Sequence, residues 1–107
     1  MWIRSAFWIG APKAGMEGDF RTAIDGEIVT GLSTLPGVRD VKALWSQRLE
    51  DNPPAIHCQI IVQFDDESAV DAMLASPGRA AMRARVREIA GMFEGAISHI
   101  DYAVGSA

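Results

Sequence analysis

Apolar and polar residues along the chain follow two spacings, and each spacing predicts a different kind of element. Four stretches alternate every second residue, which is the period of a strand whose side chains point to opposite faces. Two stretches repeat apolar residues every three or four positions, the spacing of a helix with one buried stripe. The predicted elements are a strand at 2–9, a helix at 20–35, strands at 38–49 and 56–64, an interrupted helix from Asp65 or Asp66 to Gly95, and a strand at 97–104.

Turn-forming residues mark the ends of these elements. Pro36-Gly37 ends the first helix, and the paired prolines of EDNPPA at 50–55 join two strands as an antiparallel hairpin. Ser76-Pro77-Gly78 interrupts the second helix. Three glycines and a proline make residues 10–18 a loop, and loops at strand ends often cover pockets.

The predicted order, strand, helix, strand, strand, helix, strand, is the split βαββαβ arrangement called ferredoxin-like. Right-handed crossovers place both helices on one face of a four-stranded antiparallel sheet. The first and third strands are apolar on both faces, so we expect them to be the central pair. With 107 residues, the chain is predicted to form a single α+β domain over residues 1–107.

One face of this sheet is predicted to lie under the helices, and the other to be uncovered. The side chains assigned to the covered face of the central strands are Ile3, Phe7, Ile9, Ile60, Val62 and Phe64. Those assigned to the uncovered face are Arg4, Ala6, Trp8, His57, Gln59, Ile61, Gln63, Leu44, Ser46, His99 and Asp101. Strand 38–49 allows two facings, and we prefer the one with Val41, Ala43 and Trp45 in the core. Because the uncovered face is too apolar for water and too polar for a dry core, we expect a homodimer whose sheets pack face to face around a pocket in each subunit.

Composition and charge exclude several classes of function. The net charge is −4 and the pI is near 5.0, which argues against a nucleic-acid partner, since that binding depends on clustered basic residues. Arg79, Arg83 and Arg87 recur every four residues, and we interpret them as a solvated helix face. Cys58 lies on the apolar side of its strand and is predicted to be an inert packed thiol. The apolar start is interrupted by Arg4 and no run is long enough for a membrane span, so we expect a cytoplasmic protein with no membrane partner.

Three stretches of the sequence resemble a known family. They are LPGVRDV at 35–41, FDDESAVDAMLASPGRAAM at 64–82 and MFEGAISHIDYAV at 92–104. With the βαββαβ order, they make the chain similar to EthD-like proteins of the dimeric α+β barrel superfamily over nearly its whole length. That superfamily includes cofactor-independent monooxygenases, aromatic cyclases, decarboxylases, isomerases and haem-binding branches. The resemblance therefore implies the fold more firmly than the reaction.

His57, His99 and Asp101 are the predicted catalytic residues. Imidazole titrates near neutral pH, and a carboxylate within reach fixes its tautomer and raises its basicity. Such a pair forms a general base for proton abstraction from an activated carbon or a phenol. His99 and Asp101 are two residues apart on one strand and so share a face. The alternative for each histidine is a structural or solvent-exposed role.

Arg4, Trp8, Trp45 and Gln59 are the predicted substrate-binding residues. The tryptophans offer apolar walls, Arg4 a partner for an anionic or enolate oxygen, and Gln59 a polar group that orients the ligand. Packing of the tryptophans, and hydrogen bonding of Gln59 across a dimer, are the alternatives. No metal and no cofactor is expected, because the sequence lacks a phosphate-binding glycine loop, G-x-S-x-G, H-E-x-x-H and a helical histidine for haem.

These observations predict an EthD-like, cofactor-independent enzyme that acts on a small hydrophobic, aromatic or polyketide-like molecule by histidine acid/base chemistry. One alternative is a non-catalytic binding or accessory module that holds a metabolite for a partner oxygenase. Another is a dimeric structural protein whose uncovered sheet face is only an interface.

Overall fold

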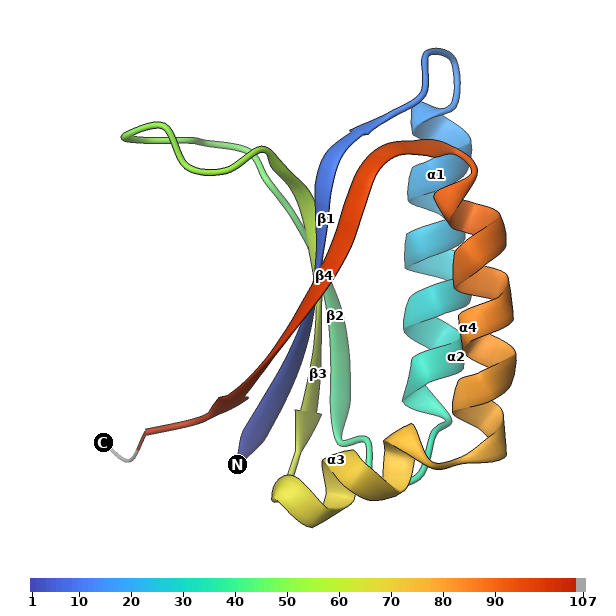
Figure 1. Cartoon of the computed structure of the whole chain (residues 1–107), viewed down its shortest axis with the longest axis vertical. Coiled ribbons are helices and arrows are strands. Elements are labelled where there is room, and N and C mark those ends of the chain that lie inside the picture. The colour runs from blue at the N-terminus through green and yellow to red at the C-terminus, as the bar shows by residue number, and fades with distance from the viewer. Residues whose placement is uncertain (106–107) are drawn as a thin grey trace.

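In the computed structural model, which describes residues 1–105, a four-stranded antiparallel sheet carries its helices on one face (Figure 1). The strands are β1 (Trp2–Pro12), β2 (Asp40–Trp45), β3 (Ile56–Phe64) and β4 (Phe93–Ala103), in the order β2-β3-β1-β4. The helices are α1 (Glu17–Thr22), the π-helix η1 (Ala23–Ile28), α2 (Val29–Ser33), α3 (Glu67–Leu74) and α4 (Pro77–Ala90). The ferredoxin-like arrangement with β1 and β3 at the centre is confirmed.

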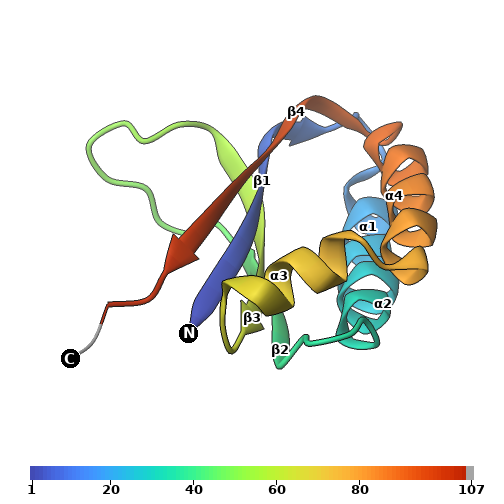
Figure 2. The ribbon, with the colours of Figure 1, turned by 60° about the horizontal axis from the view of Figure 1, so that its bottom comes forward.

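Local capping explains where α3 and α4 begin. The Asp66 carboxylate accepts a hydrogen bond from the Ala69 amide at 2.9 Å and starts α3. The Ser76 hydroxyl accepts one from the Arg79 amide at 3.3 Å, and Pro77 occupies the first turn of α4. The interruption at Ser76-Pro77-Gly78 is therefore the start of a new helix. Figure 2 shows the resulting bend, with α3 across one end of the helical layer.

The predicted element ends differ from the observed ones in several places. The strand predicted at 2–9 continues to Pro12 and α1 starts at Glu17, so the loop predicted at 10–18 is shorter. The second helix stops at Ala90, and β4 already starts at Phe93, so Gly95 lies inside a strand. The strand predicted at 38–49 is shorter and covers only Asp40–Trp45. The helix predicted at 20–35 is a continuous helical segment, but its middle turn is the wider π-helix.

The core is built around the aromatic side chain of Trp8, which is 1% exposed. Its ring makes edge-to-face contacts with Phe20 and Phe93, at centroid distances of 5.1 and 5.3 Å. Trp8 therefore faces the helices, and the predicted facing of β1 was wrong. The strand register gives the reason: Arg4 lies opposite Val62 and Ala6 opposite Ile60, and directly opposed residues share a face.

The register between β1 and β4 likewise turns the predicted catalytic residues of β4 toward the helices. His99 lies opposite Ala6 and Asp101 opposite Arg4, so both were wrongly assigned to the uncovered face. The preferred facing of β2 is confirmed, since Val41 is buried and lies opposite Val62.

The uncovered face of the sheet carries apolar side chains from all four strands, among polar ones that include Asp40, Lys42, Gln59 and Gln63. It carries Ile3, Phe7, Leu44, Ile61, Ile100 and Tyr102. Leu44, Ile100 and Tyr102 are between 42% and 47% exposed. Gln59 was correctly assigned to this face, where its amide nitrogen donates a hydrogen bond to the Ser5 hydroxyl at 2.7 Å. The loop between β2 and β3 projects from this side of the sheet, away from the helices (Figure 2).

Candidate functional site

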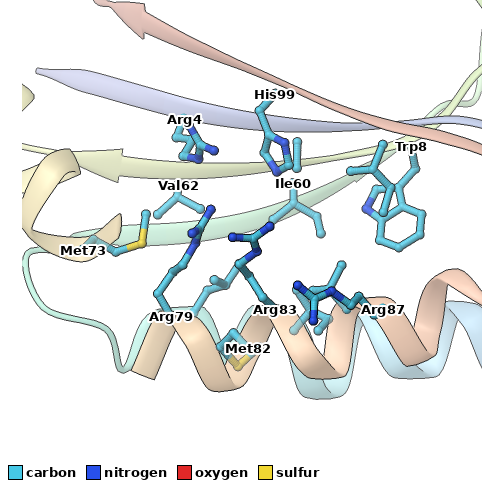
Figure 3. Close-up of a pocket in the computed structure, with 15 residues that line it drawn as sticks. Arg4, Trp8, Ile60, Val62, Met73, Arg79, Met82, Arg83, Arg87 and His99 are labelled. Carbon is cyan, nitrogen blue, oxygen red and sulfur yellow. The ribbon is translucent and has the colours of Figure 1, made fainter. Parts of the chain in front are cut away.

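A cavity of about 340 Å³ lies between the sheet and the helices (Figure 3). This volume falls in the lower part of the range of small-molecule sites, roughly 300–1,000 Å³. Most of its wall is apolar and comes from Ala6, Trp8, Ile28, Leu32, Ile60, Val62, Met73, Met82, Val86 and Ile97. Its polar lining is basic and consists of Arg4, Arg79, Arg83, Arg87 and His99. The pocket expected at the interface between two sheets is thus found on the other face, under the helices.

Arg4 is held in place by Asp101. One terminal nitrogen of the guanidinium, Nη1, donates to both carboxylate oxygens, at 2.9 and 3.1 Å. The two residues face each other across the β1–β4 register, so the strands themselves set this geometry. Asp101 therefore binds Arg4, and among residues 1–105 it makes no hydrogen bond to His99. The two side chains share a face as predicted, but the direct contact between them, which the sequence left open, is not formed.

His99 lies beside cationic groups. Burial is the largest cause of a lowered pKa for this imidazole, and the guanidinium groups of Arg4 and Arg79 lower it further, while Asp101 acts in the opposite direction. A lowered pKa keeps the imidazole neutral at neutral pH. A neutral imidazole at the wall of an apolar cavity is able to accept a proton.

We expect the pKa of His99 in solution to lie below its ordinary value of 6.5 and to rise part of the way back in an Arg79→Gln variant. The rise is partial because burial, the main cause, is unchanged. NMR titration of the imidazole measures both values. Arg85→Gln is the control, since Arg85 is on the same helix but pairs with Glu27 and Glu88. An unchanged His99 pKa in the Arg79 variant would contradict this electrostatic description.

Arg79, Arg83 and Arg87 line the cavity, which their interpretation as a solvated helix face did not include, although Arg83 and Arg87 are also exposed to solvent. In Figure 3, the guanidinium groups of Arg79 and Arg83 reach from α4 toward the strands that carry Arg4 and His99. The sequence held a signal for this orientation. Met82 and Val86 fall between the arginines at helical spacing, which places two apolar side chains on the same inward face.

His57 is not brought together with His99. It lies at the irregularity in the β1–β3 register, and its ring packs against Phe20, Trp45 and Phe93 at centroid distances of 5.8, 5.8 and 6.0 Å. Burial lowers its pKa most, and the nearby Arg21 lowers it further. These contacts show that the His57 side chain faces the helices, so its predicted place on the uncovered face was wrong. It also does not line the cavity.

Trp45 and the loop at 10–18 also lie outside the cavity lining. The Trp45 indole donates to the Asp25 carboxylate at 3.0 Å, and the Arg21 guanidinium stacks 4.4 Å from its ring centre. Gln59 is on the opposite face of the sheet. Of the four predicted substrate-binding residues, Arg4 and Trp8 reach the cavity.

The chemistry open to this site is that of ionisable side chains in an apolar surrounding. Within the described range 1–105, no group of three His, Cys, Asp or Glu side chains gathers as a metal site would require. No helix in that range is long and apolar enough to span a bilayer. Burial raises the pKa of the Cys58 thiol to about 12, as expected for a packed cysteine.

Comparisons with known proteins bear on the fold. The chain matches no protein-family model and no curated protein sequence. Among solved structures, it is similar to an EthD family protein from Bacillus halodurans, with a TM-score of 0.78 and 12% identity over 98% of this chain and 100% of the other. A dimeric ferredoxin-like protein of unknown function from Jannaschia sp. matches 97% of this chain and 100% of its own, with a TM-score of 0.67 and 17% identity. Another, from Thermobifida fusca, matches 97% of this chain and 92% of its own, with a TM-score of 0.63 and 16% identity. The chain therefore has the ferredoxin-like α+β fold of the EthD family protein and of these dimeric relatives, as the sequence resemblance implied.

Proposed function

We propose that the cavity is the active site of a cofactor-independent enzyme that acts on a small hydrophobic or aromatic molecule. The observation that carries this proposal is a histidine, His99, in a cavity whose wall is mostly apolar and whose other polar side chains are arginines. Burial and the neighbouring guanidinium groups lower the pKa of this imidazole. In this role the neutral imidazole takes a proton from an activated carbon or phenol of the bound molecule.

The arginines around His99 suit the product of that proton transfer. Removing a proton from carbon or phenol leaves negative charge on an oxygen, and guanidinium groups that line a largely apolar cavity stabilise such charge. Arg4 is the best-fixed of these groups because Asp101 holds it from β4. We therefore assign Asp101 a positioning role through Arg4. His57 does not line the cavity, so we give it no part in this proton transfer.

Turnover of 5-nitrobenzisoxazole tests the proposal. This two-ring molecule loses a carbon-bound proton to a base, its N–O bond breaks, and a coloured phenolate forms. We expect the wild-type protein to accelerate this reaction and His99→Gln to lose about 10²-fold or more of the acceleration. His57→Gln is the matched control and should keep it. An equal rate in the His99 variant would remove His99 from the role of base.

A second candidate function is a non-catalytic module that holds a metabolite for a partner oxygenase. The observation in its favour is that Asp101 is occupied by Arg4, so His99 lacks the carboxylate that would raise its basicity. Binding of 5-nitrobenzisoxazole in the cavity without any turnover would favour this function over the enzyme.

We further propose that two copies pack through their uncovered sheet faces. The exposed apolar side chains on that face and the dimeric state of the relatives from Jannaschia and Thermobifida support this assembly. Because the cavity lies on the helix side, each subunit would contain a complete site. The cytoplasmic location stays a prediction.

A further inference from the structure

The arginines that line the cavity have few counter-charges. The whole chain carries a net charge of −4, yet four arginines and no carboxylate line this cavity. Asp101 pairs with Arg4, while Arg79, Arg83 and Arg87 pair with no carboxylate among residues 1–105. Arg85, on the same helix, has both Glu27 and Glu88 as partners. The positive charge is thus concentrated at the cavity.

We infer that the molecule bound in the cavity is an amphipathic anion, a ring system that carries a carboxylate or a similar oxygen anion. This inference rests on the proposed function of the cavity and names its substrate class. The apolar walls would hold the rings, and Arg79 and Arg83 would hold the anionic group.

The position of Arg79 is the strongest support for an anion. Arg79 lines the cavity with Arg83 and Arg4, and among residues 1–105 only Arg4 of these three has a carboxylate partner, Asp101. Burial lowers the pKa of Arg79, and the charges of Arg83 and Arg4 lower it further. Arg79 is also in the first turn of α4, where the helix dipole favours negative charge and no acidic residue is present. An anion between the arginines would offset the repulsion between their guanidinium groups and would interact favourably with the helix dipole.

The chemistry of guanidinium groups favours a planar anion. Their fixed fork of N–H donors matches a carboxylate, and such charge-assisted hydrogen bonds are about twice as strong as neutral ones. Arg79 and Arg83 are four residues apart on α4, so they project from the same side of the helix. Two forks therefore point to one region of the cavity, as Figure 3 shows.

The size of the cavity limits the apolar part. An engineered apolar cavity of about 150 Å³ is known to bind a single benzene ring. The cavity here has about 340 Å³, which is room for about two rings with one polar group. Bicyclic aromatic carboxylates have this size and charge.

Calorimetry with 2-naphthoate and its neutral analogue 2-naphthamide tests the inference. The two molecules share their rings and differ in charge. We expect the wild-type protein to bind naphthoate about tenfold or more tightly than naphthamide. The variant Arg79→Gln with Arg83→Gln should lose most of this preference and keep its affinity for naphthamide. Arg85→Gln is the matched control on the same helix and should behave as the wild type does.

NMR titration of His99 gives a second readout. The charged groups around this imidazole are Arg4, Arg79, Arg83 and Asp101. A bound carboxylate adds a negative charge among them, so naphthoate should raise the pKa of His99, while naphthamide should not.

The outcomes separate this inference from the proposed function. Equal affinity for the two probes in the wild type, or a preference that survives in the double arginine variant, would overturn the anionic substrate class. The variant Ala6→Leu narrows the cavity. If naphthamide binds the wild type and binds this variant more weakly, the cavity keeps its function as a small-molecule site. Failure of both probes to bind would overturn the inference and the proposed site together.

Discussion

Leu44→Asp combined with Ile100→Asp is expected to convert a dimer into monomers, raising the dimer dissociation constant by more than about a hundredfold. The two side chains are 43% and 47% exposed and lie on the uncovered face, on the outer strands β2 and β4. In a dimer packed through this face they would be buried, so each subunit would bring two carboxylates into an apolar interface. An unpaired buried charge costs several kcal/mol. Analytical ultracentrifugation across a concentration series measures the change.

Ala80→Asp combined with Ala84→Asp is the matched control. It adds the same charge at exposed positions of α4, outside the cavity lining and on the other side of the sheet, and should leave the dimer intact. A wild-type protein that is monomeric at micromolar concentration would contradict the proposed assembly. So would a Leu44 and Ile100 variant that remains dimeric.

The site should survive this loss of the dimer. The cavity is lined by residues of the helices and of the helix-facing side of the sheet, whereas Leu44 and Ile100 are on the opposite side. We therefore expect the monomeric variant to retain its affinity for ligands of the cavity. Assembly and binding then depend on different faces of the same strands.

The fold could be predicted from the sequence because its signals are local and agree with one another. The stretches with period-two spacing and those with helical spacing occupy different parts of the chain. They are separated by Pro36-Gly37, the prolines at 50–55 and Ser76-Pro77. Element order and right-handed crossovers then leave few topologies. The end of α4 was missed because Gly95 resembles a helix stop, although in the structure it bends a strand.

The site could be predicted only in part because β1 is apolar on both faces. Trp8 and Phe7 are equally suited to a core, and alternation alone does not choose between them. The choice depends on the register with β3, where a shift between Trp8 and Ile9 changes the direction of His57. A single helix likewise does not reveal what its arginines face. Arg79 becomes part of a site only once β1 and β4 are placed opposite it.

Two opposed glycines allow β1 and β4 to bend together over the helices, as the upper part of Figure 1 shows. Gly10 and Gly95 face each other in the register, with φ of +131° and +147°. A Cβ atom at Gly95 would lie 1.9 Å from the Ile9 carbonyl oxygen. Both the backbone conformation and the close strand contact therefore require glycine. This bend brings Phe93 into the core and leads β4 toward the cavity, where His99 lies.

Gly95→Ala is accordingly expected to lower the free energy of unfolding by about 3 kcal/mol or more, since the clash is with backbone and no side-chain rearrangement relieves it. Urea unfolding followed by circular dichroism measures the loss. Gly26→Ala is the matched control: its added Cβ would meet nothing within 4 Å, and in a helix it should stabilise the protein by about 0.5–1 kcal/mol. If the Gly95 variant unfolded at the same urea concentration as the wild type, the glycine pair would not be what shapes these strands, and the position of His99 would need another cause.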